Sequence, residues 1–221
     1  GMEIQGKRIL ILGYGGRFSL AIELLRLGAA HIILVDKFAP PDDAHNLGLL
    51  PLNEQYLKEE QGCVTPRPEW ITLIEQDILS EEVRSAISQV DILLSSSVYE
   101  HLDEVESITK SLATLTNPEG IQLHYVDLRD HYFKYPFEML CYSENLWYGW
   151  LNPSSNHNRY RVWDYKKAFE QYFSDVNLIV TERDEAAFEV IRPRIRSEFM
   201  RGDLAEDSVT LIKVIARQPK L

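Results

Sequence analysis

The stretch from residue 7 to residue 36 constrains the fold of this 221-residue chain more than any other segment. It contains an apolar run (8–12), a glycine-rich turn (13–16), a helix-like segment (19–27) and a second apolar run (31–36). Short apolar runs separated by a helical pattern are typical of parallel strands joined by a crossover helix. In such a unit, amide groups of the turn and the helix N-terminus face an anionic group. The sequence therefore predicts a βαβ unit with a ligand site at the end of its strands.

The position of Asp36 indicates which kind of ligand this site takes. It lies 23 residues after Gly13, near the ~20-residue spacing at which an acidic side chain reaches ribose hydroxyls. An adenosine-containing cofactor is therefore expected. A nicotinamide dinucleotide fingerprint requires a third glycine where this chain has Phe18, because close packing of helix and strand needs a small residue there. Phe18 therefore disfavours an NAD(P)-dependent oxidoreductase, which is kept as the alternative function.

The alternation of strand-like and helical patterns continues along the chain. Further strands are predicted at 70–75, 90–95, 121–128, 176–181 and 208–216. Helices are predicted at 19–27, from Ser80 onward, and at about 185–200, where Pro193 starts, kinks or splits the helix. Strands that alternate with helices predict an α/β fold with a mostly parallel, doubly wound sheet and helices on both faces. At this length we expect a single domain spanning residues 1–221.

Two stretches are longer than a bare βαβ scaffold needs. The segment 37–69 is predicted to be largely irregular, with prolines at both ends. The segment at about 131–165 holds 11 of the 23 aromatic residues. Long irregular segments in compact domains are often lids or binding loops, so this insertion is predicted to select a substrate. The alternative is that its rings form a satellite core, because aromatic side chains bury a large area.

Charge and cysteine content narrow the choice of partners and compartment. The net charge is −11 and the acidic residues are scattered, which argues against nucleic acid as a partner. Apolar runs are too short to span a membrane, so no membrane partner is expected. Cys63 and Cys141 form no disulfide framework or metal-ligand spacing, which favours a cytoplasmic protein. The oligomeric state is open, and exposed aromatic residues would suit a homodimer.

The order of the motifs resembles that of class I S-adenosylmethionine-dependent methyltransferases, from about Lys7 to Asp130. The matching segments are Leu-Gly-Tyr-Gly-Gly at the turn, Val-Asp36 after the second strand, Gln-Asp77-Ile after the third, and Ser-Val-Tyr-Glu-His-Leu after the fourth. The resemblance implies a Rossmann-like fold whose last strand is antiparallel, with S-adenosylmethionine as cofactor and a small-molecule methyl acceptor. It also implies a set of cofactor-binding residues: Gly13, Tyr14, Gly15, Gly16, Asp36, Asp77, Ile78 and Ser95.

Within this family, the chain is similar to methyltransferases of sugar and cell-surface polysaccharide pathways. The similarity lies in the block His124-Tyr-Val-Asp127-Leu-Arg-Asp130-His131 and in the later block Asn158-Arg-Tyr-Arg161. Arg159 and Arg161 are candidates to clamp an acidic substrate, although solvated arginines are more frequent.

The chain also departs from the family pattern. The family usually has an acidic residue two positions before the first glycine, where this chain has Ile11, and the turn is one glycine short. A non-catalytic binding protein with the methyltransferase fold is therefore a further alternative.

Three residues are candidates for the acid–base chemistry of methyl transfer. Asp130 and His131 follow the fifth predicted strand, at the sheet edge where ligands collect in open α/β folds. We expect His131 to act as general base on a hydroxyl acceptor and Asp130 to orient it. His101, beyond the fourth strand, is the second candidate base. A metal site is not expected, because His124 and Asp127 point to opposite faces of a strand.

Overall fold

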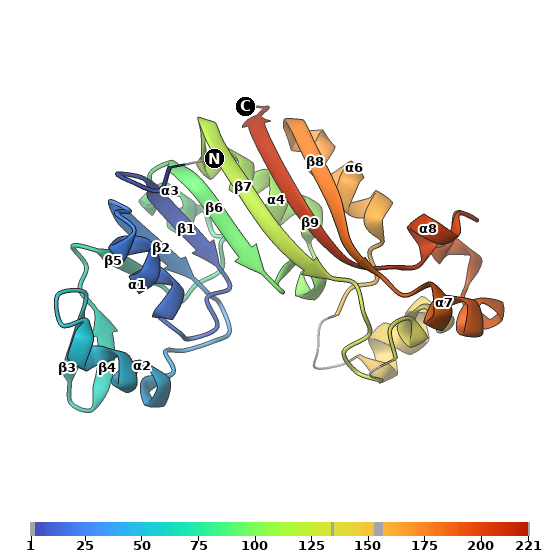
Figure 1. The fold of residues 1–221 in the computed structure, drawn as a ribbon, viewed down its shortest axis with the longest axis horizontal. Coiled ribbons are helices and arrows are strands. Elements are labelled where there is room, and N and C mark those ends of the chain that lie inside the picture. Colours follow the sequence, from blue (N-terminus) through green and yellow to red (C-terminus); the bar gives the residue numbers. More distant parts are fainter. Residues whose placement is uncertain (1–2, 134, 153–156, 221) are drawn as a thin grey trace.

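A mixed β-sheet runs through the molecule (Figure 1). In the residues that the computed structural model describes (3–133, 135–152 and 157–220), this sheet has seven strands in the order β5-β2-β1-β6-β7-β9-β8. Its strands are β1 (Arg8–Leu12), β2 (His31–Val35), β5 (Ile71–Ile74), β6 (Val90–Ser96), β7 (Thr116–Asp127), β8 (Phe173–Arg183) and β9 (Val209–Pro219).

The pairing of the strands confirms the predicted fold class. β5, β2, β1, β6 and β7 are mutually parallel, with Ile9 of β1 paired to Ile32 of β2 and to Ile92 of β6. The last strand, β9, is antiparallel to both of its neighbours, β7 and β8. Parallel strands end at the same edge of a sheet, so residues that follow β1, β2, β5, β6 and β7 meet there.

Helices cover both faces of the sheet. The α-helices are α1 (Ser19–Arg26), α2 (Asp43–Leu49), α3 (Glu81–Ala86), α4 (Val105–Leu115), α5 (Glu144–Leu146), α6 (Val162–Tyr172), α7 (Glu185–Ile191) and α8 (Leu204–Asp207). Tighter 3-10 turns lie at Leu50–Leu52, Tyr99–His101, Glu138–Cys141, Arg192–Arg194 and Ser197–Phe199, and a π-helical turn lies at Trp147–Leu151. α1 packs on the face that carries Ile9 and Ile11, and α3, α4 and α6 pack on the face that carries Leu10 and Leu12. The side chains of β1 therefore alternate between two cores.

The structure corrects two predictions about single segments. The segment 37–69 is not irregular: it contains α2 and a hairpin of β3 (Leu57–Glu60) and β4 (Cys63–Pro66). Gln61 and Gly62 link the two strands with φ of 58° and 84°, which is the left-handed pair that a tight hairpin needs. The helix predicted over about 185–200 is shorter than expected and ends at Ile191. Pro193 lies in the 3-10 turn that follows and splits the segment, which was one of the predicted outcomes, because proline has no amide hydrogen to continue an α-helix.

The aromatic insertion is described except for residues 134 and 153–156. Phe137 and Trp147 are buried against Phe188 and Ile195 of the C-terminal third in a separate apolar cluster. Part of the insertion thus forms the satellite core that was the alternative to a lid. Tyr135 and Trp150 remain 67% and 80% exposed.

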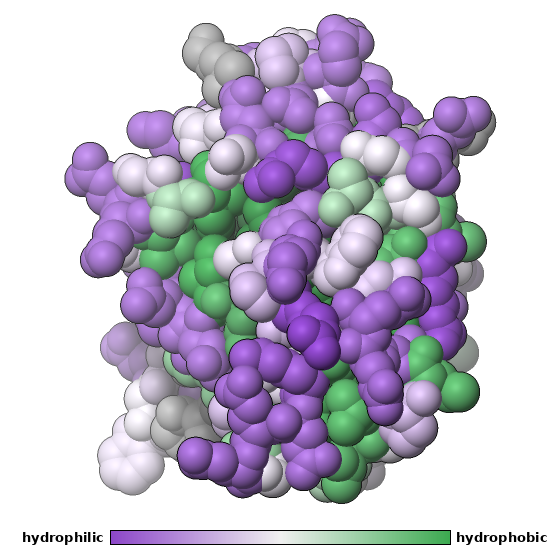
Figure 2. Space-filling model, turned by 90° about the vertical axis from the view of Figure 1, so that its left-hand side faces the viewer, coloured by the Kyte–Doolittle hydropathy of each residue, from purple (hydrophilic) through white to green (hydrophobic). Residues whose placement is uncertain are grey.

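The surface reflects the charged composition. Hydrophilic side chains make up most of the face shown in Figure 2, and hydrophobic residues reach the surface there only in separate patches. Among the described residues, no helix combines the length and the apolar character that crossing a bilayer requires.

Candidate functional site

The turn after β1 has three glycines, and their backbone conformation explains why glycine is needed there. Gly13, Gly15 and Gly16 have φ of 72°, 63° and 76°, in the left-handed region that other residues rarely adopt. A Cβ on Gly13 would lie 2.2 Å from Val98 Cγ2, and one on Gly16 would lie 2.5 Å from the Pro40 carbonyl oxygen. The turn therefore approaches its neighbours more closely than a side chain would allow.

Asp36, at the end of β2, holds this turn in place. Its Oδ2 accepts a hydrogen bond from the Gly15 amide at 3.1 Å, and its Oδ1 accepts from the amides of Phe38 and Ala39 at 2.9 Å each. A carboxylate offers about four acceptor positions. Asp36 therefore keeps capacity for a ligand hydroxyl while it orders the loops on both sides of the site.

Asp77, after β5, is paired with a residue that sequence reasoning did not identify. Lys37 Nζ lies 2.8 Å from Asp77 Oδ2, and the Leu79 amide donates to Oδ1 at 2.9 Å. The hydrogen bond from Lys37 lowers the pKa of Asp77, and the same bond raises the pKa of Lys37. Both side chains are partly exposed, so the pair contributes little to stability and leaves acceptor capacity on Asp77.

Six of the eight predicted cofactor-binding residues line two neighbouring cavities, and Gly15 and Gly16 line neither of them. A cavity of about 150 Å³ is bordered by Gly13, Asp36, Asp77, Ile78 and His101, together with Val98, Leu102 and Ile108. A second cavity of about 390 Å³ shares Gly13 and is lined by Ile11, Tyr14, Ser95 and Tyr125. The smaller cavity lies below the ~300 Å³ at which ligand sites typically begin, so it fits one end of a cofactor. The carboxylates of Asp36 and Asp77 can accept hydrogen bonds from a nucleoside, and Gly13 leaves room for it.

Ser95 does not point at the acids of the smaller cavity. Its hydroxyl lies 2.8 Å from His124 Nδ1, and His124 Nε2 lies 3.0 Å from Gln122 Oε1. Complete burial lowers the pKa of His124 to about 3, so this imidazole is neutral. Ser95 and His124 therefore belong to a buried hydrogen-bonded chain within the sheet, and His124 stands on the opposite side of β7 from Asp127, as predicted.

The structure brings three histidines together at the carboxyl edge of the sheet. His101 ends the 3-10 turn after β6, His131 follows β7, and His157 precedes α6. The ring centroids of His131 and His157 are 4.6 Å apart, those of His101 and His131 are 5.3 Å apart, and those of His101 and His157 are 5.5 Å apart. These three residues are called the histidine cluster below. Because His101 also lines the smaller cavity, the cluster adjoins the candidate cofactor site.

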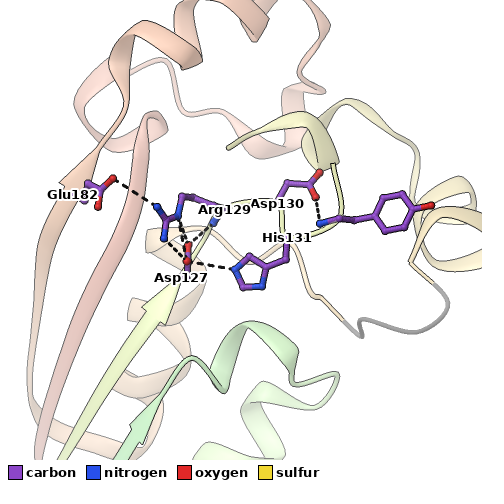
Figure 3. Close-up of polar contacts among 6 residues, drawn as sticks. Asp127, Arg129, Asp130, His131 and Glu182 are labelled. Atoms are coloured by element: carbon purple, nitrogen blue, oxygen red, sulfur yellow. Dashed lines mark hydrogen bonds and ion pairs between the residues drawn. The ribbon is translucent and has the colours of Figure 1, made fainter. Parts of the chain in front are cut away.

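The carboxylate that contacts His131 is Asp127 and not Asp130, which corrects the predicted pair (Figure 3). Asp127 Oδ2 lies 3.4 Å from His131 Nε2 and 2.6 Å from Arg129 Nη2. The contact with Asp127 raises the pKa of His131. Contacts with His131 and Arg129 outweigh burial and lower the pKa of Asp127. A proton held on Nε2 by Asp127 leaves Nδ1 as the basic nitrogen of His131.

Asp130 has a local role in the backbone. Its Oδ1 accepts hydrogen bonds from the amides of Tyr132 at 2.7 Å and Phe133 at 2.9 Å, an arrangement that aspartate favours in turns. The side chain is buried, which raises the pKa of Asp130. Figure 3 shows it pointing away from the His131 ring.

Two buried residues of the site were missed by sequence reasoning. Glu100 and His157 are each 1% exposed. Neither carboxylate oxygen of Glu100 and neither ring nitrogen of His157 has a side-chain hydrogen-bond partner among the described residues. Burial raises the pKa of Glu100 to about 7 and lowers the pKa of His157 to about 3. The only sequence signal for either residue was that Glu100 directly precedes His101.

The two arginines considered as an anion clamp donate to backbone carbonyls. Arg159 donates to the carbonyl of Tyr142 at 2.6 Å. Arg161 is fully buried and donates to the carbonyls of Asp207 at 2.8 Å and Val209 at 3.0 Å. These bonds join the insertion to the C-terminal third. In the described part of the chain, no group of three or more His, Cys, Asp or Glu residues is arranged to hold a metal ion.

Comparisons with known proteins give similar structures but no similar sequences. No protein-family model and no curated protein matches the chain. A methyltransferase from Mesorhizobium loti, described as S-adenosylmethionine-dependent, has a TM-score of 0.54 at 15% identity, over 98% of this chain and 93% of its own. Phosphoethanolamine N-methyltransferase 2 from Haemonchus contortus, in complex with S-adenosyl-L-methionine, has a TM-score of 0.58 at 13% identity, over 100% of this chain and 50% of its own.

A third similar structure is a C-methyltransferase. Geranyl diphosphate C-methyltransferase from Streptomyces coelicolor, solved with Mg²⁺, geranyl diphosphate and S-adenosyl-L-homocysteine, has a TM-score of 0.56 at 11% identity, over 96% of this chain and 72% of its own. At such identities the likeness is one of fold. The chain therefore has the Rossmann-like fold of class I S-adenosylmethionine-dependent methyltransferases.

Proposed function

We propose that this protein is an enzyme that transfers a methyl group from S-adenosylmethionine to a small-molecule acceptor. The observation that carries the proposal is the cavity between Gly13, Asp36 and Asp77, whose lining includes His101 of the histidine cluster. The proposed nucleoside site and the proposed base would thus adjoin each other. The fold shared with methyltransferases supports the same function.

The residues of the cavity match the parts of that cofactor. Asp36 would accept hydrogen bonds from the ribose hydroxyls, and Asp77 would accept one from the exocyclic amine of adenine. The amide of Ile78 would reach a ring nitrogen, and the missing Cβ of Gly13 leaves room beside Val98. The bound cofactor supplies an electrophilic methyl group on a sulfonium. Alignment of acceptor and methyl group lowers the barrier of such a displacement by roughly 7–11 kcal/mol.

His131 is the proposed general base. Asp127 holds the imidazole in the tautomer that leaves Nδ1 unprotonated, and this nitrogen takes the proton of a hydroxyl acceptor. Such a base adds about 100-fold or more to the rate. His101 borders both the cavity and the His131 ring, so we assign it to positioning the acceptor between them.

The proposal extends to the context of the enzyme. It includes a single domain over residues 1–221, a substrate-selecting role for the insertion at 131–165, and action in a sugar or cell-surface polysaccharide pathway. It also includes a cytoplasmic location, which the free thiols of Cys63 and Cys141 support.

Calorimetry with S-adenosylhomocysteine tests the cofactor site. Replacement of Asp36 by Ala is expected to weaken binding about tenfold or more, because hydrogen bonds to a charged group contribute roughly 1.5–3 kcal/mol. Asp175→Ala is the matched control, because Asp175 pairs with Arg217 at the outer edge of the sheet. Unchanged affinity in a folded Asp36→Ala protein, or binding of NAD in place of S-adenosylhomocysteine, would contradict the proposal.

A further inference from the structure

We infer that the histidine cluster and the buried Glu100 form an acceptor pocket that takes an uncharged hydroxyl group and rejects anionic acceptors. The inference rests on the proposed function and names the class of acceptor for the same site. It depends on three features of the cluster: buried polar atoms without side-chain partners, the negative charge of Asp127, and the position of His101 at the cofactor cavity.

The pocket contains buried polar atoms that lack side-chain partners. His157 and Glu100 are each 1% exposed, and no side chain of the described residues hydrogen-bonds to their ring nitrogens or carboxylate oxygens. Their polar neighbours include backbone groups, of Asn158 for His157 and of Asp127 for Glu100. Leaving a buried polar group unpaired is costly, so such groups normally meet a ligand or an ordered water. A neutral imidazole offers one donor and one acceptor. A hydroxyl group also donates and accepts, and it therefore matches His157.

The charges around the cluster disfavour an anion. Asp127 is ionised because His131 and Arg129 stabilise its charge. Glu100 lies close enough to His131 and Asp127 to interact electrostatically with both. The nearby cation, Arg129, is already bound to Asp127 and turned toward Glu182 at 3.9 Å. A carboxylate or phosphate brought to this cluster would therefore meet the Asp127 carboxylate in a medium that screens charge poorly. It would find a free counter-charge only on protonated His131, and in that state the ring cannot accept the acceptor's proton.

Hydrogen bonds hold the histidine cluster in place beside the cofactor cavity. Asn158 Nδ2 donates to the carbonyls of Tyr99 at 2.8 Å and Leu102 at 2.9 Å, and the Asn158 amide donates to the carbonyl of Glu100 at 2.7 Å. These bonds tie the loop that carries His157 to the turn that carries Glu100 and His101. Because His101 lines the cofactor cavity, a hydroxyl held by the cluster faces that cavity.

The reaction at this pocket is a proton-coupled displacement. The acceptor oxygen forms a bond to the methyl carbon, and the carbon–sulfur bond of the sulfonium donor breaks with its electron pair returning to sulfur. The hydroxyl proton passes to Nδ1 of His131. The products are a methyl ether, a neutral thioether and an imidazolium that Asp127 stabilises.

Two probes of nearly equal shape test the inference: benzyl alcohol, which carries an uncharged hydroxyl, and benzoate, which carries an anion. Each is titrated into protein with ¹⁵N-labelled histidine side chains, with and without S-adenosylhomocysteine, and His131→Asn and His157→Asn variants assign the ring signals. We expect benzyl alcohol to shift the ring signals of His131 and His157 and to bind at least tenfold more tightly than benzoate.

Variants show whether Glu100 sets this preference. Glu100→Gln is expected to reduce the preference at least threefold, whereas the control Glu138→Gln, which loses only an ion pair with Arg194 outside the cluster, leaves it unchanged. Benzoate binding as tightly as benzyl alcohol would overturn the inference. Absence of ring shifts with both probes at tens of millimolar would also overturn it. Calorimetry with S-adenosylhomocysteine and no probe measures cofactor binding by itself. A failure of the proposed cofactor site is thereby distinguished from a failure of the acceptor site.

Discussion

At the scale of single residues, the contact between Asp127 and His131 sets the proton chemistry of the site. This contact raises the pKa of His131 above its ordinary 6.5, and Glu100 adds to the rise while Arg129 opposes it. His131 accepts a proton only when neutral, so methyl transfer is expected to increase as pH rises through this raised pKa. In Asp127→Asn the pKa of His131 falls, and the rise of activity moves to lower pH.

Titration of the His131 ring by NMR measures this shift directly. Glu182→Gln is the control, because Glu182 contacts Arg129 at 3.9 Å and lies outside the contact with His131. A His131 pKa that is the same in wild type and in Asp127→Asn would refute the assignment of Asp127 as the orienting carboxylate.

The residues of the site differ in how far the sequence predicts them. Gly13, Asp36 and Asp77 follow strands whose apolar runs are clear, and the carboxyl ends of parallel strands share one edge. The choice between Asp127 and Asp130 depends on the path of the chain after β7. Asp130 turns back onto the amides of the next residues, while Asp127 stays at the strand end within reach of His131. The spacing of apolar residues does not specify the turn after β7, so it could not distinguish Asp127 from Asp130.

At the scale of elements, Asn158 connects two segments that carry the histidine cluster. Its side chain donates to the carbonyls of Tyr99 and Leu102 and accepts from the Tyr165 hydroxyl at 3.1 Å. Asn158→Ala leaves these buried groups unpaired, and a loss of about 2 kcal/mol or more in the free energy of unfolding is expected. Urea denaturation measures the loss, with Asn177→Ala on the exposed part of β8 as the matched change. A loss below about 0.5 kcal/mol would show that these bonds do not hold the turn.

The elements that sequence patterns predict well are those with a clear apolar pattern. β1 is a short continuous apolar run, α1 carries apolar residues spaced three and four apart, and both begin where predicted. The β3–β4 hairpin has one largely buried residue on each strand, Leu57 and Val64, so its apolar pattern is weak. Its signal was the Gln61-Gly62 pair, which is less specific than the Asn-Gly pair typical of such turns.

At the scale of the whole molecule, buried histidines link stability to pH. Burial lowers the pKa of His124 from an ordinary 6.5 to about 3, whereas the unfolded chain protonates this residue near 6.5. Between these values the unfolded state binds more protons, so the free energy of unfolding decreases as pH falls, by up to about 1.4 kcal/mol per pH unit for each such site. His157 has the same sign, since burial also lowers its pKa to about 3.

His124→Gln separates this proton linkage from the loss of packing. The variant is expected to be less stable than wild type at pH 7, because Ser95 loses its partner within the sheet. Between pH 7 and pH 5.5, however, its free energy of unfolding should fall by about 1 kcal/mol less than that of wild type. Urea unfolding at the two pH values gives both quantities. If wild type and variant lose the same stability over this range, His124 is already protonated in the folded protein, and the buried chain from Ser95 to Gln122 has a different arrangement of hydrogens.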